Sequence, residues 1–217
     1  MIRLENLTKI YSLDGRNKTV ADRINATFPT GVSVGLLGRN GAGKSSLLRM
    51  ISGASDPTEG HIETTGLVSW PVGFAGSFHP DLTGQQNCRF IARIYGVDTD
   101  GLLAFVEDFA ELGRSFHMPV RSYSSGMRSR LGFGASMGIR FDTYLVDETT
   151  AVGDAAFRRK SRAVFADRMR HSDAIMVNHS MNQVREFCNA GIVLENGQMQ
   201  YFEDLEEAIA QHQALMA

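Results

Sequence analysis

Gly38-Arg39-Asn40-Gly41-Ala42-Gly43-Lys44-Ser45 is the stretch of this sequence that decides the fold. It matches the pattern GxxxxGK[ST] at every fixed position. An apolar, β-branched run, Val32 to Leu37, precedes it, and a segment with helical spacing, Lys44 to Ile51, follows. The order of strand, glycine loop and helix is the setting that the pattern requires, so we expect an α/β core with a tight loop between a central strand and a helix.

The residue types in this loop suit the binding of phosphate groups. Glycines let the backbone approach phosphates closely, and successive N–H groups together with the helix N-terminus supply positive potential. We expect Lys44 to reach the β and γ oxygens of bound ATP and Ser45 to ligate Mg²⁺. The residues expected to contact the nucleotide here are Gly38, Arg39, Asn40, Gly41, Ala42, Gly43, Lys44, Ser45 and Ser46.

Two carboxylates follow a second apolar strand, Tyr144 to Val146. Asp147, at the strand end, is expected to hold Mg²⁺ through water, because the metal charge keeps this carboxyl ionised. Glu148, one residue further on, is placed to accept a proton and polarise the attacking water. Together with the loop this pair predicts an ATPase of the P-loop class, but it does not separate a kinase, a helicase and a transporter.

A third element, residues 121–131, separates these classes. Its sequence, RSYSSGMRSRL, resembles the LSGGQ signature of ABC ATPases, with Ser124 and Gly126 at the Ser and second Gly positions. The resemblance implies that Ser124, Ser125 and Gly126 open a helix whose N-terminal amides bind the γ-phosphate held by a second copy of the chain. One chain would then carry two half-sites, and the working unit would be a homodimer.

The resemblance extends to three further positions, and the chain departs from the family at a fourth. Asp154, six residues after Glu148, stands at the family's D-loop and would help to join the two half-sites. His179 follows the strand Ala174 to Val177 and resembles the switch histidine that contacts the γ-phosphate. Tyr11 resembles the aromatic residue that stacks on adenine, although an ordinary strand-edge tyrosine is the alternative. Phe74 stands where the family usually has a Gln.

Either a neighbouring polar group such as Ser77 or His79 takes over the role of that Gln, or coupling uses backbone and shape. The surrounding segment, residues 69–84, resembles the corresponding loop of bacterial polysaccharide exporters, as do residues 123–127 and 147–154. The resemblance favours the ATPases of capsular polysaccharide export, because the chain ends soon after its last hairpin. O-antigen and teichoic-acid exporters are the alternatives.

Such a resemblance implies an ATP-hydrolysing transport subunit, with ATP and Mg²⁺ as its ligands. A homodimer would lie beneath two copies of a membrane permease, at the cytoplasmic face of the bacterial inner membrane. A periplasmic polysaccharide co-polymerase and an outer-membrane conduit would complete the pathway. Two other classes, a soluble ABC ATPase of DNA repair or translation and a P-loop kinase, remain alternatives.

The rest of the pattern predicts an α/β fold in a single nucleotide-binding domain, residues 1–217. An N-terminal antiparallel element, from strands at 2–8 and 24–28, precedes a mostly parallel core sheet, and a helical subdomain at about 85–140 is inserted. Later elements are helices at 154–169, 181–187 and 204–215, and a hairpin at 192–202 with Asn-Gly in its turn.

Composition limits the remaining function classes. The chain has 217 residues, 43% hydrophobic and 21% charged, with a net charge of −2, so it predicts a globular protein with no global attraction to nucleic acid. No apolar run approaches the ~20 residues of a membrane-spanning helix, and we expect a soluble protein that stays in the cytoplasm. Cys88 and Cys188 lack metal-ligand spacing and are expected to be reduced core residues.

Overall fold

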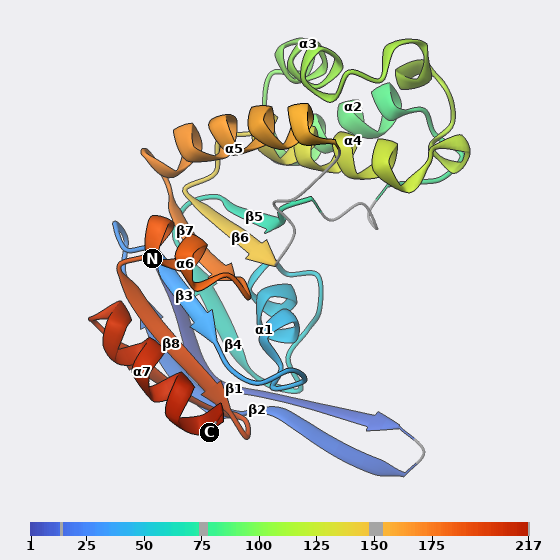
Figure 1. Cartoon of the computed structure of the whole chain (residues 1–217). Helices are drawn as coiled ribbons and strands as arrows, with labels where there is room; N and C mark the ends of the chain where they lie inside the picture. Colours follow the sequence, from blue (N-terminus) through green and yellow to red (C-terminus); the bar gives the residue numbers. More distant parts are fainter. Residues whose placement is uncertain (14, 74–77, 148–153, 217) are drawn as a thin grey trace. The chain divides into compact units, whose positions relative to one another are not determined.

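The computed structural model describes residues 1–13, 15–73, 78–147 and 154–216. Contacts divide the chain into two compact units (Figure 1). The core unit comprises Met1–Pro71, Phe141–Glu148 and His171–Ala217, and the helical unit comprises Val72–Arg140 and Thr149–Arg170. The segment expected as a helical insertion, about 85–140, falls within the helical unit.

A six-stranded sheet forms the centre of the core unit, in the order β5-β6-β7-β3-β8-β9. All neighbouring pairs are parallel except β8 and β9, which form the predicted hairpin. The mostly parallel sheet expected from the sequence is therefore confirmed. Its strands are β3 (Val34–Leu37), β5 (Val68–Pro71), β6 (Thr143–Asp147), β7 (Asp173–Val177), β8 (Ala190–Glu195) and β9 (Gln198–Phe202).

Helices cover both faces of this sheet, and successive residues of β3 point to opposite faces. Val34 and Leu36 belong to the main hydrophobic core with the apolar side of α1 (Lys44–Ile51). Gly35 faces the other way, and a Cβ there would lie 2.6 Å from Val184 in α6 (Met181–Phe187) and 3.3 Å from Leu205 in α7 (Leu205–Met216). The small residue lets these helices pack directly on the central strand.

A three-stranded antiparallel sheet, β2-β1-β4, completes the core unit. Its strands are β1 (Ile2–Leu13), β2 (Arg16–Phe28) and β4 (Glu59–Thr64). The antiparallel N-terminal element is confirmed, but its strands run well beyond the expected bounds of 2–8 and 24–28. The outer half of the hairpin is largely exposed. Its two strands stay paired there, although the alternation of apolar residues has stopped.

The helical unit is built from α2 (Gly84–Tyr95), α3 (Thr99–Ala110), α4 (Ser125–Gly138) and α5 (Ala155–Met169), with 3₁₀ helices η2 (Gly113–His117) and η3 (Val120–Ser122). A capping box starts α2: Thr83 Oγ1 accepts the Gln86 amide at 3.1 Å, and Gln86 Oε1 accepts the Thr83 amide at 2.9 Å. Capping residues thus set where such a helix begins, and its apolar face sets which side packs against its neighbours.

Two expectations from composition bear on this fold. Cys88 and Cys188 are both buried and unpaired, and burial raises the pKa of each thiol to about 12. Within the described ranges, no helix combines the length and the hydrophobicity needed to cross a membrane.

Phe109 is the centre of the aromatic core of the helical unit. Its ring lies 5.6 Å from Phe105, 5.9 Å from Phe133 and 5.2 Å from Phe157, and only 2% of the residue is exposed. We expect Phe109→Ala to lower the free energy of unfolding by about 3 to 5 kcal/mol, because a cavity replaces a ring that three helices share.

Urea denaturation followed by circular dichroism measures this loss. Phe90→Ala is the matched control, because Phe90 is 60% exposed on α2 and its truncation should change stability by only a few tenths of a kcal/mol. Equal losses in the two variants would contradict the assignment of Phe109 to the core.

Candidate functional site

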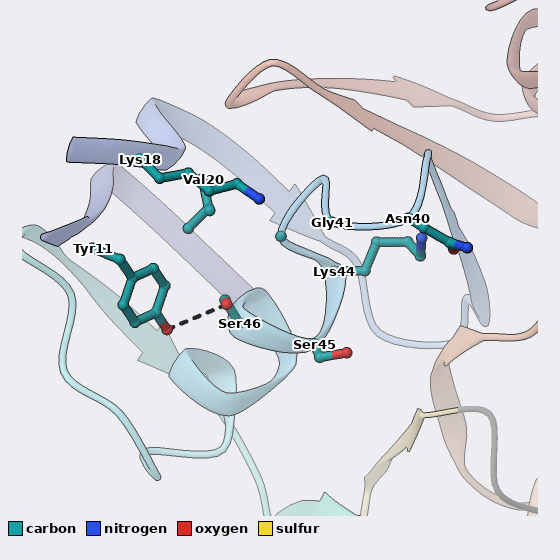
Figure 2. Close-up of a pocket in the computed structure, with 9 residues that line it drawn as sticks. Tyr11, Lys18, Val20, Asn40, Gly41, Lys44, Ser45 and Ser46 are labelled. Carbon is teal, nitrogen blue, oxygen red and sulfur yellow. Dashed lines mark hydrogen bonds between the residues drawn. The ribbon is translucent and has the colours of Figure 1, made fainter. Parts of the chain in front are cut away.

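A pocket of about 350 Å³ lies in the core unit where β1 and β2 face the loop after β3 (Figure 2). It brings together seven of the residues expected to bind the nucleotide and two that were not expected. Its lining is Tyr11, Lys18, Val20, Asn40, Gly41, Gly43, Lys44, Ser45 and Ser46. Gly38, Arg39 and Ala42, which were also expected to contact the nucleotide, are not part of this lining.

Two glycines explain how the loop holds its shape. Gly38 has φ 150°, and a Cβ at this position would collide with the carbonyl oxygen of Leu194 in β8. Gly43, the N-cap of α1, has φ 109°, and its Cβ would lie 2.8 Å from the Cβ of Val20 in β2. Side chains at either position would push the loop off its neighbouring strands, so both glycines are required by the fold of the loop.

The loop and the start of α1 bring together groups that suit phosphate oxygens. Lys44 Nζ donates to the carbonyl oxygens of Gly38, at 2.6 Å, and Arg39, at 3.1 Å, so the ammonium is held against the loop itself. The first turn of α1 contains no acidic residue, and the positive potential of the helix N-terminus is therefore not opposed there. An ammonium beside N-terminal amides is the donor set that a phosphate requires.

Tyr11 is tied to the same helix. Its hydroxyl donates to Ser46 Oγ at 3.2 Å, as Figure 2 shows, and 40% of the residue is exposed. Lys9 Nζ lies 5.2 Å from the ring centroid. The position of Tyr11 at the pocket agrees with a ring available for stacking, and its role toward adenine stays a prediction.

Parallel topology brings two other predicted residues, Asp147 and His179, to the edge of the sheet where the loop begins. Asp147 is the last residue of β6 and pairs with Val177, the last residue of β7, and His179 lies two residues beyond. Because β3, β6 and β7 are parallel neighbours, their carboxyl ends meet at one edge. Glu148 lies outside the described residues.

Neighbouring side chains shape the turn that carries His179. Asn178 Oδ1 accepts the Ser180 amide at 2.7 Å, and Asn178 Nδ2 donates to Gln183 Oε1 in α6 at 2.5 Å. His179 lies between these anchors and is exposed. Asn178 and Gln183 were not predicted as site residues, although an Asn directly before the His is a recognisable turn signal.

In the helical unit, Ser124 is the N-cap of α4. Its Oγ accepts the Met127 amide at 3.2 Å, and the residues Ser124, Ser125 and Gly126 are all exposed. A Cβ on Gly126 would meet nothing nearer than Ser124 Oγ at 3.9 Å. Packing within the described chain therefore does not require a glycine here, whereas close approach of another molecule would.

Asp154, the last predicted site residue, caps α5 in the same unit. Its Oδ1 accepts the Phe157 amide at 2.9 Å and its Oδ2 accepts a hydrogen bond from Arg130 at 2.8 Å. The Phe157 amide and the Arg130 charge hold the pKa of this carboxyl below its ordinary value. Arg130 belongs to α4 and also lies 4.5 Å from the Phe157 ring centroid. The arginine thereby joins the start of α5 to the helix that Ser124 caps.

The segment expected to replace the family's Gln is only partly described. Phe74 and Ser77 lie outside the described residues. His79 Nδ1 accepts the Asp81 amide at 3.2 Å, and the His79 amide donates to Asn87 Oδ1 at 2.8 Å. The ring of His79 is thus used within its own turn, and its part in coupling stays a prediction.

Comparisons with known proteins place this geometry in context. Residues 21–151 match the sequence profile described as ABC transporter. A polysialic acid transport ATP-binding protein from Escherichia coli is 48% identical over 98% of this chain and 96% of its own length. A capsule polysaccharide export ATP-binding protein from Neisseria meningitidis is 43% identical over 99% of this chain and 100% of its own length.

A solved structure extends the comparison to the fold. The dimeric, post-hydrolysis form of the ATP-binding cassette MJ0796, bound to ADP and Pi, has a TM-score of 0.75 and covers 94% of this chain and 99% of that one, at 21% identity. This likeness in structure covers both the sheets and the helices described above.

Proposed function

Because this chain belongs to the ABC transporter family, we propose that it binds and hydrolyses ATP to drive export of a capsular polysaccharide through a separate membrane permease. The observation that carries the proposal is the pocket at Lys44, built from a glycine loop and a helix N-terminus, in a chain that aligns along nearly its whole length with capsule exporters. The pocket supports ATP hydrolysis, and the alignment supports a capsular polysaccharide as the cargo.

ATP hydrolysis gives a separate role to each of five predicted site residues in the core unit. Lys44 and the loop amides bind the β- and γ-phosphates, and His179 contacts the γ-phosphate. Ser45 and Asp147 would hold Mg²⁺, whose charge would offset that of the phosphate oxygens. Glu148 accepts a proton from the water that attacks the γ-phosphorus, so the bond to ADP breaks and inorganic phosphate forms.

The helical unit supplies the second half-site to another copy of the chain. We infer that the exposed amides beginning α4, at Ser124, Ser125 and Gly126, bind the γ-phosphate held by the partner subunit. Through its hydrogen bond with Arg130, Asp154 ties the start of α5 to α4, and it helps to join the two half-sites. Two ATP molecules then close the dimer and hydrolysis reopens it.

The remaining components follow from the same proposal. The homodimer binds two copies of the permease at the cytoplasmic face of the inner membrane, and a periplasmic polysaccharide co-polymerase and an outer-membrane conduit continue the path. Names of the relatives support a capsular polymer over O-antigen or teichoic acid as the cargo. We infer that polymer specificity resides in the permease.

Deletion of the gene in a capsulated host tests this proposal. Surface polymer should disappear and lipid-linked polymer should accumulate inside the cells, and the wild-type gene should restore export. A Lys44→Ala gene should not restore it. Full surface capsule in the deletion strain, with loss of O-antigen or teichoic acid instead, would reject the capsular assignment and leave the ATPase assignment standing.

A further inference from the structure

Lys18 brings a second ammonium to the pocket, and no sequence motif predicts it. The residue lies on β2 directly opposite Tyr11 on β1 in the antiparallel pairing. Side chains of directly opposed residues lie on the same face of a sheet, so the position of Tyr11 at the pocket also brings Lys18 there. Both residues line the pocket, and Figure 2 shows the Lys18 side chain extending from the hairpin toward Gly41.

The ammonium lies very close to the loop. A Cβ built on Gly41 would be 3.4 Å from Lys18 Nζ. Gly41, with φ 79°, lies in the middle of the loop whose amides are proposed to hold phosphates. A phosphate oxygen bound at these amides would therefore lie within reach of a charge-assisted hydrogen bond from Lys18.

Charge and bonding both leave Lys18 available for an anion. None of the described residues lining the pocket is acidic. Lys44 already donates to two carbonyl oxygens of the loop, whereas the ammonium of Lys18 makes no hydrogen bond or ion pair within the described part of the chain. An exposed lysine ammonium beside a glycine loop, with no partner among the described residues, is suited to bind a phosphate group.

We propose that Lys18 is a nucleotide-binding residue that contacts the phosphates shared by ATP and ADP from the side of the β1–β2 hairpin. The inference rests on the proposed function, since it requires nucleotide in this pocket. It assigns the hairpin a second contact besides Tyr11. Tyr11 would stack on the base and Lys18, opposite it on the next strand, would bind phosphate. Bound nucleotide would therefore contact both the hairpin and the loop.

Isothermal titration of the full chain with ATP, ADP and adenosine tests this assignment. Lys18→Gln should weaken ATP and ADP binding about tenfold, the effect of losing one hydrogen bond to a charged group, and should leave adenosine affinity unchanged. Lys18→Arg should retain most of the affinity. Arg16→Gln is the matched control, because it removes a positive charge from the same strand outside the pocket.

Three results would overturn the assignment. Wild-type affinity of Lys18→Gln for ATP and ADP rejects the contact while leaving the proposed function intact. An equal loss for adenosine shows that Lys18 acts on the ribose or base. Failure of the wild-type chain to bind either nucleotide rejects the proposed function, and the role of Lys18 with it.

Discussion

Glu148→Gln is expected to abolish ATP turnover while leaving ATP binding intact. The amide keeps the size of the carboxyl but cannot accept a proton from the attacking water, so steady-state hydrolysis should fall by about 100-fold or more. Lys44, Ser45 and Asp147 are unchanged in this variant, and the affinity for ATP should stay close to that of the wild type. Phosphate release and equilibrium binding of ATP measure the two quantities separately.

Glu207→Gln provides the control for this experiment. Glu207 lies exposed in the first turn of α7, and its replacement makes the same chemical change away from the pocket. It should hydrolyse ATP at the wild-type rate. If Glu148→Gln also kept the wild-type rate, Glu148 would not be the general base, and the proton would have to pass to another group.

Ser124→Arg is expected to abolish hydrolysis without weakening the binding of ATP to a single chain. The long cation replaces the exposed N-cap of α4 and blocks the approach of a partner's γ-phosphate to the first-turn amides. Loss of such donors to a transferring phosphate costs about 100-fold in rate. Ser124→Ala separates the effects, because it removes the cap and leaves the approach open.

Mixing variants shows whether Ser124 acts on its own chain or on its partner. Ser124→Arg and Lys44→Ala are each expected to be inactive alone. In a mixed dimer, the intact loop of the Ser124→Arg chain meets the intact α4 of the Lys44→Ala chain, and one complete site forms. Mixed preparations should therefore regain hydrolysis. A mixture as inactive as its components would indicate that Ser124 completes the site of its own chain.

The parts of this site that follow from local sequence were predictable. A glycine loop between a buried strand and a helix has few other solutions, because Gly38 and Gly43 adopt backbone conformations that other residues disfavour. Asp147 could be placed for a similar reason, since an apolar strand of a parallel sheet directs its last residue to the binding edge. Ser124 was recognised through the resemblance of residues 121–131 to the ABC signature, and it is the N-cap of α4.

Strands without apolar alternation could not be predicted in the same way. β4 was missed because nearly all its residues are exposed, and only pairing with β1 makes it a strand. β5 was missed because it has four residues and ends at Pro71, at the edge of the large sheet. Alternation of apolar and polar residues arises when one face of a strand is buried. β4 and β5 show little of this alternation.

Lys18 shows a different limit. Pattern matching finds the residues of the loop, but the contribution of the hairpin depends on strand register. Leu13 pairs with Arg16, and counting back along the two strands from this pair places Tyr11 opposite Lys18. A signal was therefore present once the strands were known to continue to residues 13 and 16. The polar character of residues 16–19 concealed that continuation.

Each ATP is proposed to lie between two copies of this chain, and the mass of Glu148→Gln in solution tests this most directly. Light scattering should give the 23.9 kDa of one chain without nucleotide and twice that mass with saturating ATP. A variant that binds ATP and remains at the mass of one chain would contradict a site completed by Ser124 of the partner copy.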